Sequence, residues 1–525
     1  MAPPDPFTRS VIQAGLIAAA DESFAVLKKT AMSPIIYEVL DVGTGVTDAR
    51  GEIMSSGAGI PGFIGVLDKA VKRIIGVHDG TIRDGDVFVT NDPYWGGVTH
   101  LNDVVVAQPV FHDGRLLAWT TSIAHWNDVG GMTPGSIAAD ATEIFQEGLR
   151  LPCLRLFEAG RRQDAVFDII ALNSRLPDFV TGDLWAQISA GRRSALPILS
   201  MARAYGPDAI EDAVLAAFAE GEARSLQGLG RLPHGRFPVA MEQDEGDTWH
   251  GTVEISPDSF TVDLRDAPDQ RRGPFNTSAD GTRIACQLIF KVLTDPTLFA
   301  NAGSFRPLRV LTRKGSIFDP NPPAAHGFYS ETRIRLADML WNGLSRVIPD
   351  RLPAGHFSSI CGTVIAGIHP DNGRLYTMVE PQMGGWGATA DRDGLDAMYS
   401  TNHGDTFNCP VEICEARYGI DVGWRRLSDS EAGRGLHRGG RGLSICYRPR
   451  GPATLSAGFS HTSVPVWGAA GGDPGGHNAI RVHRADGRSE GFAFASGIRI
   501  GPGDAVHIET ANGGGWGPAQ ERKQG

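Results

Sequence analysis

Apolar residues in the first half of the chain recur mainly at helical spacing, interrupted by one long stretch with strand spacing. Through residues 7–32 they return every three or four positions, which predicts a helix that Pro34 ends. Further helices are predicted over 65–76 and over 207–227, where Ala, Glu and Leu predominate and helix breakers are few. The character of the chain changes shortly afterwards, so we expect a first unit that ends near residue 230.

The stretch from 86 to 125 has the pattern of a β-hairpin. Two β-branched apolar runs, 104–111 and 116–124, flank the turn dipeptide Asp113-Gly114. The length of the connecting loop decides which residues face each other at the open end of this hairpin.

A two-residue loop places His125 opposite Asn102, whereas a three-residue loop places His125 opposite Asp103. Either register brings His100, Asp103 and His125 to the open end. Only the second puts Asp103 and His125 on one face, because a shift by one residue turns every side chain over. The spacing leaves both registers open.

Beyond residue 230, strands and turns become more frequent. Residues 248–266 and 304–313 alternate as strands around a helical pattern at 278–294, and glycine-rich turns dominate from about 355. We predict an α+β fold, a large multi-sheet enzyme body with mixed and antiparallel sheets and a largely β C-terminal third. The predicted domains are an N-terminal α/β unit with a metal site (1–230), a central α+β unit (231–355) and a C-terminal Gly-rich β unit (356–525).

Composition and charge narrow the class of protein. The 525 residues carry 49 Lys and Arg against 60 Asp and Glu, a formal net charge of −11, which argues against a nucleic-acid groove or an anionic-membrane surface. Glycine is the outlier at 67 residues, about 13% against a usual ~7%. The N-terminus lacks a secretory pattern, no window has the ~18 consecutive apolar residues of a membrane span, and the six cysteines form no C-x-x-C pair. We therefore expect a soluble, cytoplasmic protein that binds neither nucleic acid nor membrane.

The chemistry of the chain is indicated by one repeated motif. The sequence lacks the P-loop and His-Glu-x-x-His patterns. It contains His-x-x-Asp twice, at His100 to Asp103 and at His125 to Asp128, at the open end of the hairpin. Two imidazoles and a carboxylate converging there suit a divalent transition metal, and one more ligand would complete a common set. Either motif alone is more typical of a solvated turn, and the histidines without such partners, His403 among them, are interpreted as ordinary surface or core residues.

Further motifs accompany this pair along the chain. They include Ser33-Pro34, Asn91-Asp-Pro-Tyr94, Thr99-His-Leu-x-Asp103, Ala124-His-x-x-Asp-Val-Gly-Gly131, Glu147-Gly-Leu-Arg-Leu-Pro152, Asn173-x-Arg175, Gly182-Asp-Leu184, Gly384-Gly-Trp-Gly-Ala388, Pro410-Val-Glu412, Arg438-Gly-Gly-x-Gly442 and Gly513-Gly-Gly-Trp-Gly517. Together, from about residue 5 to 520, they resemble the hydantoinase B / 5-oxoprolinase β family, which includes caprolactamase β and is similar to the α subunits of acetone and acetophenone carboxylases.

The resemblance implies one half of a two-component enzyme. The partner, an ATP-binding hydantoinase A-type subunit, would bind ATP and magnesium and phosphorylate the amide oxygen of a cyclic amide, and the two would assemble as a heterotetramer. The present chain would hydrolyse the activated hydantoin, oxoproline or lactam with a bound metal, zinc first and manganese or iron as alternatives. The resemblance assigns this metal to Asp41, His100, Asp103 and His125.

Two further acidic residues near this set, Asp128 and Glu38, are candidate general bases, or else partners that orient a ligating imidazole. Many relatives have Ala-His-His-Ala-Asp where this chain has Ala124-His-Trp-Asn-Asp128, so we expect Trp126 to narrow or reshape the substrate pocket. Two other functions fit the resemblance. One is a subunit of a biotin-independent, ATP-dependent ketone carboxylase of the acetone or acetophenone type, and the other is a non-catalytic scaffold for the partner.

Overall fold

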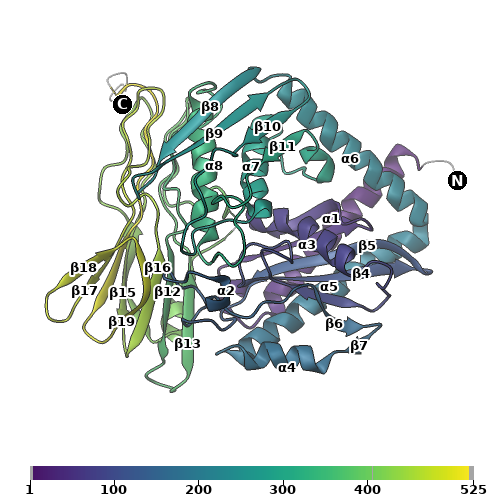
Figure 1. Ribbon diagram of the computed structural model, residues 1–525, viewed down its shortest axis with the longest axis horizontal. Coiled ribbons are helices and arrows are strands. Elements are labelled where there is room, and N and C mark those ends of the chain that lie inside the picture. Colours follow the sequence, from purple (N-terminus) through teal and green to yellow (C-terminus); the bar gives the residue numbers. More distant parts are fainter. Residues whose placement is uncertain (1–3, 405, 520–525) are drawn as a thin grey trace.

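The computed structural model describes residues 4–404 and 406–519, which form four β-sheets with helices packed between and around them. In Figure 1 the first third of the chain forms the right-hand side of the molecule, and the C-terminal strands form its left flank. The predicted α+β class, with mixed and antiparallel sheets, is confirmed.

The largest sheet is built from the first third of the chain and is antiparallel throughout. Val104 and Val106 belong to a hydrophobic cluster with α5 (Pro177–Tyr205), whereas Val105, between them, packs with Phe63 and Leu67 of α3 (Pro61–Val77). Because side chains alternate along a strand, α5 and α3 cover opposite faces of the sheet. The strand order is β2 (Ile53–Gly59), β1 (Val42–Asp48), β5 (Arg115–His125), β4 (Asp103–His112), β3 (Val87–Thr90), β6 (Leu154–Glu158) and β7 (Arg161–Arg162), and the covering helices are α1 (Pro6–Thr30), α3 (Pro61–Val77) and α5 (Pro177–Tyr205).

The β4–β5 hairpin combines features of both predicted registers. Its loop is the two-residue turn Asp113-Gly114, in which both residues have positive φ (48° and 77°) and His112 pairs with Arg115. One register shift follows, because Leu117 has no partner and Val110 pairs with Ala118. This bulge adds the one residue that a longer loop would have supplied. Asp103 therefore pairs with His125, as the second register predicts, although the loop length attached to that register is wrong.

All four predicted helices are present, and two long ones were not predicted. The patterns at 7–32, 65–76, 207–227 and 278–294 correspond to α1, α3, α6 (Pro207–Leu229) and α7 (Ala279–Thr294). The unpredicted ones are α5 and α8 (Tyr329–Ser345). Helix α8 buries almost every side chain, charged ones included, so its charged residues do not mark a solvent-exposed side as they do in a surface helix.

The second sheet has four strands and packs against α7 and α8 around its own hydrophobic cluster. Its pairs are antiparallel except for β10 and β11, which run parallel. A parallel pair needs a crossover connection, and here α7 lies between the two strands in the chain. The order is β11 (Leu308–Leu311), β10 (Phe260–Asp263), β9 (Thr248–Ile255) and β8 (Gly235–Glu242).

The C-terminal third forms two antiparallel sheets, as its glycine-rich pattern predicts. One hydrophobic cluster runs from Leu27 to Ala511, so the first and last thirds of the chain share a core. The boundaries near 230 and 355 stay predictions. The first of these sheets has the order β13 (Leu375–Glu380), β12 (Gly362–Ile368), β16 (Ala453–Gly458) and β19 (Phe494–Ile500). The second has the order β14 (Ile420–Leu427), β15 (Leu443–Pro449), β20 (Ala505–Glu509), β17 (Ala479–His483) and β18 (Ser489–Phe492). The described residues also form the short helices α2 (Pro34–Tyr37), α4 (Asp164–Leu172), α9 (Val411–Arg417), η1 (Ile144–Gln146) and η2 (Ala302–Phe305).

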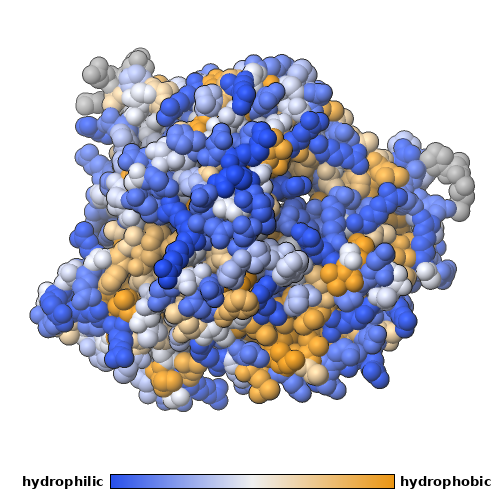
Figure 2. Space-filling view, in the orientation of Figure 1, coloured by the Kyte–Doolittle hydropathy of each residue, from blue (hydrophilic) through white to orange (hydrophobic). Residues whose placement is uncertain are grey.

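Two surface features concern apolar residues. Helix α1 is long and apolar enough to cross a membrane by length and composition, but its Ile12, Leu16 and Leu27 are buried, and it packs against α5. Hydrophobic residues also gather over α4 and β6 on the face in Figure 2, and α4 exposes 84% of Leu172 and 49% of Ile169. Apolar composition in α1 therefore serves packing, whereas α4 leaves part of its apolar side uncovered.

Candidate metal centre

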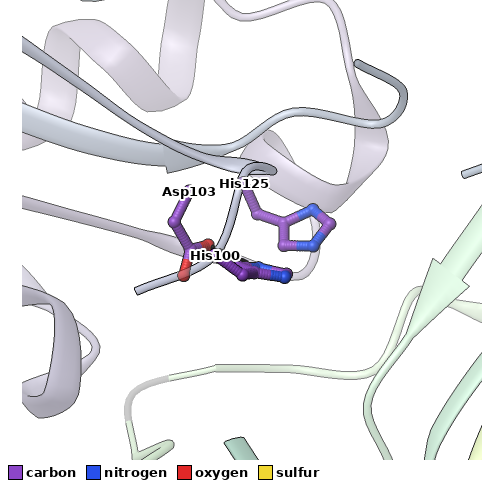
Figure 3. A group of neighbouring side chains, drawn as sticks. All are labelled: His100, Asp103 and His125. Atoms are coloured by element: carbon purple, nitrogen blue, oxygen red, sulfur yellow. Dashed lines mark ion pairs between the residues drawn. The ribbon is translucent and has the colours of Figure 1, made fainter. Parts of the chain in front are cut away.

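Three side chains from the open end of the hairpin converge in the interior. His100 lies in the turn before β4, Asp103 begins β4 and His125 ends β5. One potential ligand atom from each lies within 4.8 Å of the others, and all three side chains are buried. Figure 3 shows the two imidazoles and the carboxylate grouped together, with an ion pair between His100 and Asp103.

Buried amides hold the loops that carry these residues. The Asn91 side chain donates to the carbonyls of Leu101 and Leu149 and accepts from the Leu151 amide. Asn102 donates to the Trp126 carbonyl at 2.9 Å, which ties the turn before β4 to the end of β5. These bonds from side chain to backbone join the segments that carry the cluster.

The carboxylate of Asp103 is oriented by its own hydrogen bonds. Its Oδ2 accepts from the Tyr329 hydroxyl at 2.8 Å and from the Thr99 hydroxyl, while Oδ1 lies 3.2 Å from His100 Nε2. Burial by itself raises the pKa of Asp103, but the neighbouring imidazoles of His100 and His125 and the Thr99 hydroxyl outweigh it and bring the pKa to about 2. The carboxylate is therefore ionised at neutral pH, with Oδ1 facing the histidines.

The two imidazoles each present a ring nitrogen without a hydrogen-bond partner. Their ring centroids are 5.2 Å apart, and the Nδ1 atoms of both His100 and His125 are buried without a hydrogen-bond partner. Burial, with the repulsion from His100, lowers the pKa of His125 to about 4. A neutral, buried ring nitrogen with no partner is a group that a metal ion would satisfy.

Asp41 lies directly before β1 and approaches the same cluster. Its carbonyl accepts from the His125 amide at 3.1 Å, and its buried Oδ1 has no hydrogen-bond partner. Burial and the negative charge of Asp103 raise the pKa of Asp41 well above its ordinary value. Asp41 is not one of the three residues whose ligand atoms lie within 4.8 Å, but it lines the same cavity, and its role as a ligand stays a prediction.

A cavity of about 70 Å³ surrounds the cluster and includes residues that the sequence pattern did not single out. His403 lines it, buried, with no partner for Nε2, and burial together with the charge of Arg333 lowers its pKa to about 3. Arg333 and Tyr329 of α8 also line it. His403 follows the buried polar residues Ser400 and Asn402, but no local spacing connects it to the hairpin.

The two candidate general bases do not line this cavity. The buried carboxylate of Asp128 accepts from Arg175 Nη1 at 2.9 Å and from the amides of Gly130, Gly135 and Arg175, so it organises the loop after β5. Glu38 ends α2 and is half-buried.

Trp126 was expected to reshape the pocket, and this expectation is wrong. Its side chain is 1% exposed, belongs to the hydrophobic core and donates from Nε1 to Gln187 Oε1 at 2.9 Å. The residue follows the last residue of β5, so it faces away from His125 and into α5.

The fold is thus an α+β body with a cluster of two histidines and one aspartate in an interior cavity. The chain belongs to the hydantoinase B/oxoprolinase family, whose profile it matches over residues 5–519. It is 28% identical over 549 residues to the B component of a putative D-/L-hydantoinase of Pseudomonas sp. (strain NS671), covering 99% of this chain and 91% of the relative. It is 29% identical over 543 residues to the beta subunit of caprolactamase from Pseudomonas jessenii, covering 99% and 92%.

Solved structures agree with these relatives. The crystal structure of ATP-dependent caprolactamase from Pseudomonas jessenii superimposes with a TM-score of 0.92 at 26% identity, over 99% of this chain and 92% of that chain. A nucleotide-free acetone carboxylase superimposes with a TM-score of 0.89, over 99% and 76%, but at 18% identity, which shows the common fold alone. The hydantoinase and caprolactamase relatives are both subunits of larger enzymes.

Proposed function

We propose that this chain is the metal-bearing subunit of an ATP-dependent enzyme that hydrolyses a cyclic amide. Asp41, His100, Asp103 and His125 would hold one divalent metal, zinc first, with manganese or iron as alternatives. The observation that carries the proposal is the buried cluster itself, in which ring nitrogens of His100 and His125 have no partner and Asp103 Oδ1 faces them. Two imidazoles and carboxylate oxygens form a donor set that suits these metals.

The residues around the cluster would prepare it for hydrolysis. Thr99 and Tyr329 hold Asp103 by one oxygen and leave the other free, as the surroundings of a metal ligand commonly do. Burial excludes bulk water and keeps His125 neutral. A bound divalent metal would supply a coordinated water with a pKa near 7, or polarise the activated carbon's oxygen. Asp128 would act through the loop after His125, which it holds, and not as a base at the reacting atoms.

Activation of the amide would take place on a partner protein. An amide is resonance-stabilised and its nitrogen is a poor leaving group, so phosphorylation of its oxygen by ATP and magnesium would produce an imidate phosphate that water attacks more readily. The proposed partner is a hydantoinase A-type protein, in a heterotetramer. The hydantoinase and caprolactamase relatives are each named as one component of their enzyme, which supports a multi-subunit enzyme here.

The hydrolase is preferred to the ketone carboxylase on sequence likeness, because the acetone carboxylase that shares the fold over 99% of this chain is only 18% identical to it. Caprolactamase beta is similar over 99% of this chain, whereas the acetophenone carboxylase delta subunit of Aromatoleum aromaticum matches over 53% of it, at 27% identity. The buried cluster of His100, Asp103 and His125 argues against a scaffold that lacks chemistry.

The test is the metal content of the purified chain by elemental mass spectrometry, followed by turnover with the partner. We expect about one zinc per chain, lost together with ATP-dependent amide hydrolysis in His100→Ala. The matched control is His112→Ala, at the other end of the same hairpin, which should keep both the metal and the ATP-dependent amide hydrolysis. Wild-type chain that binds no metal after reconstitution, or a His100→Ala variant with unchanged turnover, would refute the proposal. Bicarbonate-dependent ATP turnover with a ketone would favour the carboxylase instead.

A further inference from the structure

Arg333 of α8 is a buried arginine in the wall of the cavity, and among the described residues no carboxylate lies within ion-pair distance of it. Its exposure is 1%, and its Nε has no hydrogen-bond partner. The hydrogen bond it does make, from Nη1 to the Gly62 carbonyl, is long at 3.4 Å. A buried guanidinium is costly unless acceptors surround it, so an under-bonded one that lines a cavity indicates a ligand with anionic oxygens.

The first turn of α3 lies against this guanidinium. A Cβ added to Gly62 would come within 2.6 Å of Arg333 Nη1 and 2.7 Å of Nη2, so only glycine leaves room for the arginine there. Helix α3 has 17 residues and no capping side chain at Ile60, and Phe63 of its first turn lines the cavity. The positive end of the helix dipole and the arginine charge thus lie side by side at the cavity.

The charges in the cavity wall favour an anion once a divalent cation is present. Asp41 and Asp103 together balance a charge of +2, so with a divalent cation bound neither of them is left to pair with Arg333. The remaining acids of the wall have partners of their own. Glu380 pairs with Arg425 at 3.0 Å, and Glu331 accepts from Ser359, Ser460 and the Ile360 amide.

We propose that Arg333 and the first turn of α3 bind an anionic oxygen group of the substrate beside the metal centre. This inference rests on the proposed function, since it deepens the chemistry of the same cavity. The planar guanidinium presents paired donors that match two oxygens of a phosphoryl group or of a carboxylate. The first would be the phosphoryl group on the activated amide oxygen, and the second a carboxylate carried by the substrate itself.

Helix α8 provides a matched control two residues away. Arg335 is also buried, at 2% exposure, has unbonded guanidinium nitrogens and lies over an aromatic ring as Arg333 does, but its charge is paired, since Nη1 lies 2.9 Å from Glu245. It does not line the cavity. Changing Arg335 therefore perturbs the same helix and removes the same kind of group without touching the proposed site.

The experiment is calorimetric titration of inorganic phosphate, and separately of acetate, into the purified chain, with metal content measured on each sample. We expect Arg333→Gln to weaken binding of at least one anion tenfold or more while metal content stays at the wild-type level. Arg333→Lys, which keeps the charge but not the paired donors, should bind the anion with an affinity between those of the wild type and Arg333→Gln. Arg335→Lys should bind within twofold of wild type.

The outcomes separate the two proposals. Tighter binding of phosphate than of acetate, lost in Arg333→Gln, assigns the site to a phosphoryl group, and the reverse assigns it to a carboxylate. Equal binding by wild type and Arg333→Gln, no binding of either anion by wild type, or an equal loss in Arg335→Lys would overturn the anion site and leave the metal centre untouched. Arg333-dependent binding in a wild-type chain that holds no metal would support the anion site and count against the proposed function alone.

Discussion

The contact between Ser33 and Asp183 gives a stability prediction whose size follows from the structure. The buried Asp183 of α5 accepts hydrogen bonds from the amides of Met32 at 2.7 Å and Ser33 at 3.1 Å, and from the Ser33 hydroxyl. Burial raises the pKa of Asp183 from 3.8 to about 6, although these hydrogen bonds oppose the shift. The contact joins the end of α1 to α5 and so supports the segment that leads to Asp41.

The perturbation is Asp183→Asn, which can keep all three hydrogen bonds, since the amide oxygen accepts from both backbone amides and the amide nitrogen donates to the Ser33 hydroxyl. Because the folded-state pKa of Asp183 is raised, the native wild type binds more protons than the unfolded chain between pH 3.8 and about 6. The contribution of this raised pKa to the free energy of unfolding of the wild type is therefore fully present below pH 3.8 and is lost as pH rises through about 6.

The full shift of about 2 pKa units corresponds to about 3 kcal/mol, of which about 2 kcal/mol falls between pH 4.5 and 7.5. With an unfolding entropy of about 2.1 cal/mol/K per residue over the whole chain, a change of about 2 kcal/mol in the free energy of unfolding corresponds to a change of roughly 2 °C in Tm. The assay is thermal unfolding of both proteins in matched buffers at half-unit steps of pH. We expect the Tm of Asp183→Asn to increase relative to that of the wild type as pH rises. A difference in Tm that stays flat across this range, or that moves in the other direction, would refute the reasoning.

Two further predictions concern residues beside the site. Trp126→Phe loses the hydrogen bond to Gln187 and opens a small cavity, which should cost about 2–3 kcal/mol in urea unfolding. Its metal content should equal that of wild type, and loss of metal would show that Trp126 acts on the cavity after all. Tyr329→Phe removes one of the two hydroxyls that hold Asp103 Oδ2, so zinc affinity should fall about tenfold in a chelator competition. Unchanged affinity would show that Thr99 alone suffices to orient the carboxylate.

The amino-acid sequence by itself determined the hairpin and the cluster at its open end. Alternating β-branched runs and an Asp-Gly turn are local signals, and they place Asp103 near His125 because a short antiparallel pair fixes distances along its whole length. This pattern did not determine whether Asp103 and His125 lie on the same face of the hairpin. The bulge at Leu117 decided it, and a single bulge leaves no clear mark in the sequence.

The rest of the cavity was decided by the tertiary structure. His403, Arg333 and Asp41 come from segments far apart in the chain, and nothing in their local spacing connects them. The charged residues of α8 resemble surface residues in sequence, because burial of an arginine depends on what other segments place around it. The same holds for Trp126, whose neighbour in sequence lines the cavity while it packs into α5. Local patterns set the strands and turns, and long-range packing set which side chains are left to face the cavity.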